Sequence, residues 1–216
     1  MSKSYTYYHD LILPSILGKH GDIYLRGINQ KRLFARKRRA YLRRAIVIYI
    51  QRRMVTTGVP VIHPREISSL PIEIEFDHFI VSLRSSIEHS MQLINSIAHL
   101  GLLPTNRHRN NTADRVVSID EVINALRSSN DKILIRLGNY LLKEKQADWY
   151  KTLHTLRIEM FHNKYDKFII RDNRLFFGLP DNQQVDLLNY CSEEIDNVER
   201  ILSYSLRSLC RFKHIQ

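Results

Sequence analysis

The sequence predicts a mainly α-helical protein: a bundle of about five to six helices with one small β-hairpin, plus a basic helical segment at the N-terminus. Three observations support this fold class. The 216 residues include only 7 Gly and 6 Pro, which is few for a protein built from strands and tight turns. Segments 73–100 and 181–211 carry apolar residues at intervals of three and four. Between 167 and 178, two short apolar runs flank an Asp-Asn pair, the pattern of a hairpin.

The N-terminal segment divides into two parts. Residues 1–24 fit either a strand or a short helix, and Pro14 argues against a long helix there. Gly18, Gly21 and Gly27 predict a loop region. From Asn29 to about Met54, Arg, Lys, Leu and Ala favour one long helix. Its partial apolar stripe is predicted to consist of Leu33, Phe34, Tyr41, Leu42, Ala45 and Tyr49.

Residues 55–71 are predicted to form a linker, because Gly58, Pro60, Pro64 and Pro71 interrupt the helical pattern. This linker divides the chain into a basic N-terminal segment, 1–71, and a helical bundle, 72–216.

The bundle segment opens with the helix predicted over 73–100. Its buried side is predicted to consist of Phe76, Ile80, Leu83, Ile87, Met91, Ile94 and Ile97. A polar loop, 101–117, follows and is basic enough to contact phosphate. Ser118 and Glu121 then form a capping box at the start of a short helix. Asn130 or Asp131 caps the next helix.

Two further helices complete the prediction. The segment 147–164 carries Trp149, Leu153, Leu156 and Met160 at the spacing of one buried side. After the hairpin, Pro180 and Asp181 are expected to open a last helix that runs to about Arg211. Its inward residues are predicted to be Leu188, Cys191, Ile195, Val198, Leu202, Leu206 and Leu209.

The positive charge is concentrated in one window. The formal net charge is +11, and no acidic residue occurs between Asp22 and Glu66. This pattern predicts a surface that binds a polyanion, with nucleic acid favoured over an anionic membrane surface or a simply solvated charged face. The residues expected to contact nucleic acid are Arg32, Arg36, Lys37, Arg38, Arg39, Arg43 and Arg44.

Several protein classes are not indicated. Cys191 and Cys210 are the only cysteines and do not form a disulfide framework, so we expect a reducing compartment. The N-terminus lacks the pattern of a signal peptide, and the longest strongly apolar run, 45–50, is too short to span a membrane. His78 and His89 are eleven residues apart, too far to share a metal ion. We therefore expect a soluble cytoplasmic protein without a metal or other cofactor.

One pair of residues suggests chemistry on phosphate. Arg157 and His162 lie near the end of the segment 147–164, and Asn163 follows directly. A histidine moves a proton near neutral pH, and an arginine stabilises charge developing on a phosphate. A purely structural role is the alternative for each residue. In that case Arg157 forms an ion pair with an acid such as Glu193 or Glu194, and His162 and Asn163 only stabilise the C-terminal end of the helix.

The order of elements, together with Arg157, four intervening residues and His162, resembles the HEPN superfamily of helical-bundle proteins. The resemblance covers residues 72–212. It implies a metal-independent endoribonuclease with Arg157, His162 and Asn163 as catalytic residues. Toxins and defence proteins are the family members it points to, and a toxin implies an antitoxin partner. Members of the family form homodimers whose two motifs share one composite cleft. Two side chains five residues apart on an ideal helix point about 140° apart. Either the helix ends or distorts before His162, or two copies meet in such a dimer.

The chain departs from the family pattern at Ile158, where a polar residue usually follows the arginine. The alternative function is therefore a non-catalytic HEPN-like module that binds nucleic acid or protein. Some family toxins are modified on a tyrosine two residues after the histidine, whereas Tyr165 lies three residues after His162.

Overall fold

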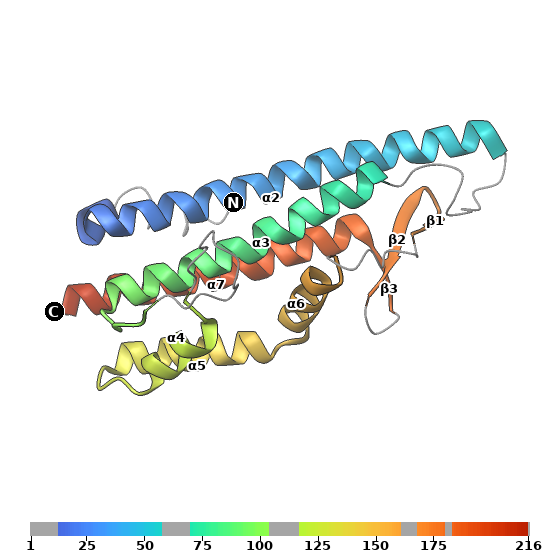
Figure 1. Ribbon diagram of the computed structural model, residues 1–216. Coiled ribbons are helices and arrows are strands. Elements are labelled where there is room, and N and C mark those ends of the chain that lie inside the picture. Colours follow the sequence, from blue (N-terminus) through green and yellow to red (C-terminus); the bar gives the residue numbers. More distant parts are fainter. Residues whose placement is uncertain (1–12, 58–69, 104–116, 161–167, 180–182, 216) are drawn as a thin grey trace. The chain divides into compact units, whose positions relative to one another are not determined.

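The computed structural model describes residues 13–57, 70–103, 117–160, 168–179 and 183–215 (Figure 1). These residues are mainly helical, with one small antiparallel sheet, which confirms the predicted fold class. In chain order the elements are α2 (Leu13–Thr57), α3 (Leu70–Ile97), α4 (Ile119–Arg127), α5 (Lys132–Gln146), α6 (Asp148–Met160), β1 (Ile169–Arg171), β2 (Arg174–Gly178), β3 (Gln184–Asp186) and α7 (Leu187–Ile215).

The chain forms two compact units. The first contains 1–31, 85–147 and 198–216, and the second contains 32–84 and 148–197. Each unit takes its residues from segments that are distant in the sequence. The long helices α2, α3 and α7 contribute residues to both units.

The core of the second unit is built around aromatic rings from α3, β2 and α7. The ring centroids of Phe76 and Phe177 are 5.0 Å apart, and those of Phe177 and Tyr190 are 5.2 Å apart, in edge-on geometry. Phe76 and Phe177 are almost fully buried. Edge-on contacts of this kind stabilise a core beyond the area that they bury, and here they join the sheet to two helices.

The sheet has the order β1-β2-β3, and both strand pairs are antiparallel. The predicted hairpin is confirmed: Ile169 pairs with Phe176, and Asp172 and Asn173 form the turn with φ of 51° and 55°. Asp and Asn tolerate such positive φ values, which a tight two-residue hairpin turn requires.

The first unit confirms both predicted helix caps. The Ser118 side chain accepts from the backbone of Asp120, and Glu121 accepts from the Ser118 backbone N–H, which completes the capping box. Asp131 caps α5 by accepting from the backbone N–H groups of Ile133 and Leu134. These caps satisfy N–H groups that have no partner within the helix.

The predicted loop around Gly18, Gly21 and Gly27 is wrong, because all three glycines lie within α2. Pro14 is the second residue of the helix, where its missing N–H costs no helical hydrogen bond. At Gly27 the reason for glycine is close packing. A Cβ atom there would lie 2.6 Å from Cδ2 of the His89 ring.

The predicted apolar stripe of α2 is only partly correct. Leu42 and Tyr49 are buried, but Leu33, Phe34 and Tyr41 are 55%, 49% and 48% exposed. The buried side of α2 instead consists of Leu25, Ile28, Ala35, Leu42, Ile46, Tyr49 and Ile50. Large apolar side chains therefore occur on two sides of this helix.

The buried sides predicted for α3 and α7 are confirmed, except that Leu188 is only half-buried. The predicted start of α7 is wrong, because residues 184–186 form β3 and the helix begins at Leu187. On α6, Leu153 and Leu156 are buried as predicted, whereas Trp149 is half-buried and Tyr150 is buried in its place. The predicted linker is shorter at both ends, since α2 extends to Thr57 and α3 begins at Leu70.

Candidate functional site

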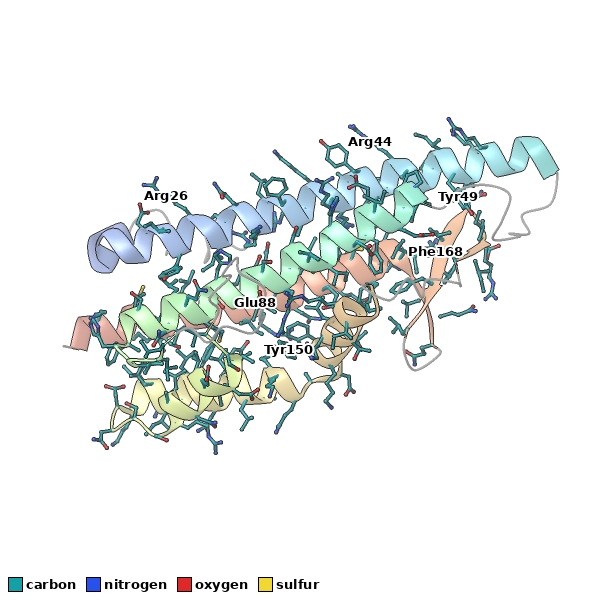
Figure 2. All side chains as sticks on the ribbon, viewed as in Figure 1. Arg26, Arg44, Tyr49, Glu88, Tyr150 and Phe168 are labelled. Atoms are coloured by element: carbon teal, nitrogen blue, oxygen red, sulfur yellow. The ribbon has the colours of Figure 1, made fainter. Side chains whose placement is uncertain are left out.

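The basic residues of α2 differ in how far they reach solvent. Lys37, Arg39, Arg43 and Arg44 are exposed, and we call these four residues the basic face. Figure 2 shows Arg44 on the outer side of α2 and the buried Tyr49 on the opposite side. The window from 23 to 65 contains no acid, so no neighbour along the helix neutralises these four cations.

Arg32, Arg36, Arg39 and Arg43 follow one another at spacings of four, three and four along α2. Residues at this spacing share one side of a helix, and the row is about 16 Å long at 1.5 Å per residue. Arg32 and Arg36 are half-buried and each interacts with other groups of the protein. The row therefore becomes more exposed toward Arg39 and Arg43.

Arg38 has a different environment from the basic face. Its Nη1 donates to both carboxylate oxygens of Glu75 at 3.0 Å, which links α2 to α3 within the second unit. The side chains of Arg38 and Glu75 are 27% and 21% exposed. The guanidinium also lies 5.9 Å from the centroid of the Tyr41 ring. Of the seven predicted nucleic-acid contacts, Arg38 is thus already engaged in an ion pair.

The helix that carries Arg157 is fixed to α3 by a buried polar contact. Arg84, only 5% exposed, donates through Nη1 to the hydroxyl of Tyr150, and its guanidinium carbon lies 4.9 Å from the centre of that ring. The side chains of Leu153 and Leu156, further along the same helix, are also buried. The first three turns of α6 therefore have a defined position in the second unit.

Arg157 lies in the last turn of α6 and is half-buried, with interactions of its own. It follows Tyr150 by seven residues, which places the two on the same side of the helix. Ile158, next to it, is 49% exposed. His162 and Asn163, the other predicted catalytic residues, and Tyr165 lie outside the described residues.

Several ionisable groups other than these residues have clear pKa shifts, among them Asp77, Cys191 and Cys210. Burial and the charge of Glu73 raise the pKa of Asp77 on α3 to about 6. Burial raises the pKa of the Cys210 thiol to about 11, and it raises that of Cys191 well above the ordinary range. Both cysteines are free and buried, so neither thiol is placed for nucleophilic chemistry.

One surface hollow in the first unit has a volume of about 460 Å³ and is lined by Asn124, Arg127, Ser128, Ile135 and Asn139. Arg127 donates through Nε to the Asn139 side chain at 3.1 Å. None of the residues predicted from the sequence as catalytic or nucleic-acid-binding lines this hollow.

Within the described ranges, no three His, Cys, Asp or Glu side chains lie close enough together to hold a metal ion. None of the helices in the same ranges has the length and apolar character needed to cross a membrane. Comparisons with family models, curated proteins and solved structures gave no match.

Proposed function

We propose that this protein binds RNA through the basic face of α2 and cleaves it without a metal ion, in the manner of the HEPN superfamily. The observation that carries the proposal is the exposure of Lys37, Arg39, Arg43 and Arg44 on a helix whose window 23–65 has no acid. The phosphate backbone of RNA carries one negative charge per nucleotide and can neutralise these cations. Binding to it releases condensed counterions and is therefore favourable at low salt.

The arginines of the basic face suit a chain of phosphates. Each guanidinium offers two parallel donors to the oxygens of one phosphate. Arg39 and Arg43 are four residues apart, so their Cα atoms are separated by about 6 Å along the helix axis. Neighbouring phosphates of a nucleic-acid strand are separated by a similar distance, and adjacent arginines can therefore contact adjacent phosphates.

The proposed cleavage assigns different roles to Arg157 and His162. Arg157 stabilises the charge that develops on the scissile phosphate, and His162 moves the proton of the attacking 2′-hydroxyl or of the leaving oxygen. Asn163 adds an amide beside the histidine. The anchoring of α6 through Tyr150 and Arg84 supports this proposal, because a catalytic arginine needs a helix with a fixed position.

The spacing of Arg157 and His162 leads us to propose a homodimer, with a composite cleft to which each protomer contributes its motif. If the protein is a toxin, an antitoxin is the expected partner.

RNA cleavage in EDTA tests the catalytic half of the proposal. The wild-type chain should cleave single-stranded RNA, and His162→Ala should reduce the rate on the order of 100-fold or more without weakening RNA binding. His154→Ala is a matched control, since His154 is an exposed histidine on α6. Cleavage that survives His162→Ala would remove this assignment.

A non-catalytic RNA-binding module is the second candidate function. The exposed Ile158 favours it, because the family pattern has a polar residue at that position. This candidate predicts salt-dependent RNA binding by the wild-type chain with no turnover in EDTA or in Mg²⁺. The Ile158→Asn variant separates the two candidates further, since only an active site would respond with a changed rate.

A further inference from the structure

The side of α2 that faces solvent carries a seven-residue apolar repeat. Its members are the adjacent pairs Leu33-Phe34, Ala40-Tyr41 and Val47-Ile48, which we call the heptad stripe. All six residues are exposed, and the five large ones have exposed fractions between 48% and 55%. Residues seven apart lie almost in line along a helix. The stripe therefore runs parallel to the helix axis for about 22 Å.

Cations alternate with the apolar pairs. Lys37 and Arg44 lie one turn after the first and second pairs, and both are exposed. At about 100° per residue, Lys37 and Arg44 fall within the arc between Leu33 and Phe34 rather than beside it. Arg43 and Arg39 lie on the flank of the same surface. An occupant must therefore offer apolar groups every seven residues and negative charge between them.

We propose that the heptad stripe is the docking site for an acidic amphipathic helix of a partner protein. Helices that pack along one another do so through positions that repeat every seven residues, with a second contact position three or four residues later. In α2 that second position is Lys37 or Arg44, so the partner must supply negative charge there. Carboxylates on the partner, placed between its apolar residues, would pair with Lys37 and Arg44 inside the contact. Lys37 and Arg44 also belong to the basic face, so RNA and the partner helix would compete for these two cations. The apolar pairs take no part in the proposed RNA binding, and they can therefore be tested separately.

Two other occupants fit the surface less well. A second copy of the same stripe supplies no counter-charge, since the chain has no acid between Asp22 and Glu66 and every register would set cations against cations or apolar groups. A lipid surface requires an apolar face with cations at its edges. Here Lys37 and Arg44 lie in the middle of the apolar arc, where they would be drawn into the acyl region.

The probe is a synthetic 22-residue helical peptide with Leu pairs every seven residues and Glu pairs between them. We expect this acidic peptide to bind the full chain and to lose at least tenfold in affinity with the Val47→Gln/Ile48→Gln variant. A peptide with Lys in place of Glu should not bind. Ile74→Gln/Leu103→Gln is the matched control, since Ile74 and Leu103 are exposed apolar residues outside the stripe, and it should retain the wild-type affinity.

Three results would overturn the proposal. The first is no binding of the acidic peptide at 100 µM, or equal binding by the Val47→Gln/Ile48→Gln variant. The second is a dimer of the wild-type chain that this variant disperses, which would assign the stripe to a second copy. The third is sedimentation with phosphatidylcholine/phosphatidylserine vesicles that the same variant abolishes. RNA affinity should be unchanged in Val47→Gln/Ile48→Gln, so failure here is distinguishable from failure of the RNA proposal.

Discussion

The guanidinium of Arg38 lies 3.0 Å from both carboxylate oxygens of Glu75, whereas Arg39, the next residue, is exposed. Adjacent arginines on one helix thus have different roles. The side chain of Arg38 joins α2 to α3, and that of Arg39 is available to a ligand. Substitution of Arg38 should therefore affect mainly stability, and substitution of Arg39 should affect mainly binding.

We predict that Arg38→Gln lowers the free energy of unfolding by about 1 kcal/mol, because a half-buried ion pair is lost. Arg39→Gln should change it by less than about 0.5 kcal/mol. Urea unfolding of both variants and of Glu75→Gln, completed as a double-mutant cycle, measures the coupling. If Arg38→Gln leaves stability unchanged and weakens RNA binding as much as Arg43→Gln does, the assigned roles are wrong.

Gly27→Ala should destabilise the protein although alanine favours helices. The new Cβ would meet Cδ2 and Nε2 of the His89 ring at 2.6 and 3.1 Å. That ring is held by its Nδ1, 2.7 Å from the Ser85 carbonyl oxygen. We expect a loss of about 1–3 kcal/mol from overpacking, against a gain of about 1 kcal/mol from helix propensity. In a His89→Ala background the same change should stabilise, which thermal unfolding would detect.

Asp77 should make stability fall as the pH rises from about 4 to about 6. Its pKa is raised from 3.8 to about 6 by burial and by Glu73, so the folded protein binds the proton more tightly than the unfolded chain. The stabilisation is present below pH 3.8 and is lost as the carboxyl ionises in the folded state. After allowance for solvent screening, the loss is about 1 kcal/mol.

The Asp77→Asn variant checks this prediction. It should be more stable than the wild-type chain at pH 7 and should show a weaker dependence on pH between 4 and 6. Chemical unfolding at several pH values gives the comparison. A variant with the wild-type pH profile would show that Asp77 ionises normally in the folded protein.

Glu144 and Arg200 should show unequal effects of substitution. Arg200 donates through Nη2 and Nε to the two carboxylate oxygens of Glu144 at 3.1 and 3.3 Å, and Glu144 is only 8% exposed. Arg200→Ala leaves a buried carboxylate without this partner and should cost about 2–3 kcal/mol. Glu144→Gln should cost less, since it removes the buried charge. Equal losses would contradict this explanation.

The buried sides of α3 and α7 were predicted almost residue by residue, whereas the buried side of α2 was not. On α3 and α7 almost every apolar residue in the repeat faces the core, so spacing alone identifies the buried side. On α2 apolar residues occupy a buried side and an exposed side, and the predicted stripe combined the two. The seven-residue spacing of Leu33-Phe34, Ala40-Tyr41 and Val47-Ile48 was the signal that separates them.

Other errors arose where tertiary contacts override local preference. Gly27 suggested a loop, but the glycine is explained by the His89 ring, which comes from a distant segment. Strand β3 has no apolar alternation and is defined by pairing with β2, as in Phe177 with Val185. The roles of the α2 arginines could not be told apart from the sequence. Arg38 differs because it pairs with Glu75, which lies on α3.

The salt dependence of RNA binding decides whether the basic face of α2 contacts the phosphate backbone. The affinity for a single-stranded RNA should be measured between about 50 and 200 mM salt for the wild-type chain and for Lys37→Gln/Arg39→Gln/Arg43→Gln/Arg44→Gln. The control, with the same change in charge, is Lys132→Gln/Arg136→Gln/Lys143→Gln/Arg207→Gln, four exposed cations outside the basic face. We predict that the basic-face variant loses about 100-fold in affinity and that its logarithmic salt slope falls by about 2–3, while the control stays close to the wild-type chain. Equal losses in the two variants, or no RNA binding by the wild-type chain at 50 mM salt, would contradict the account.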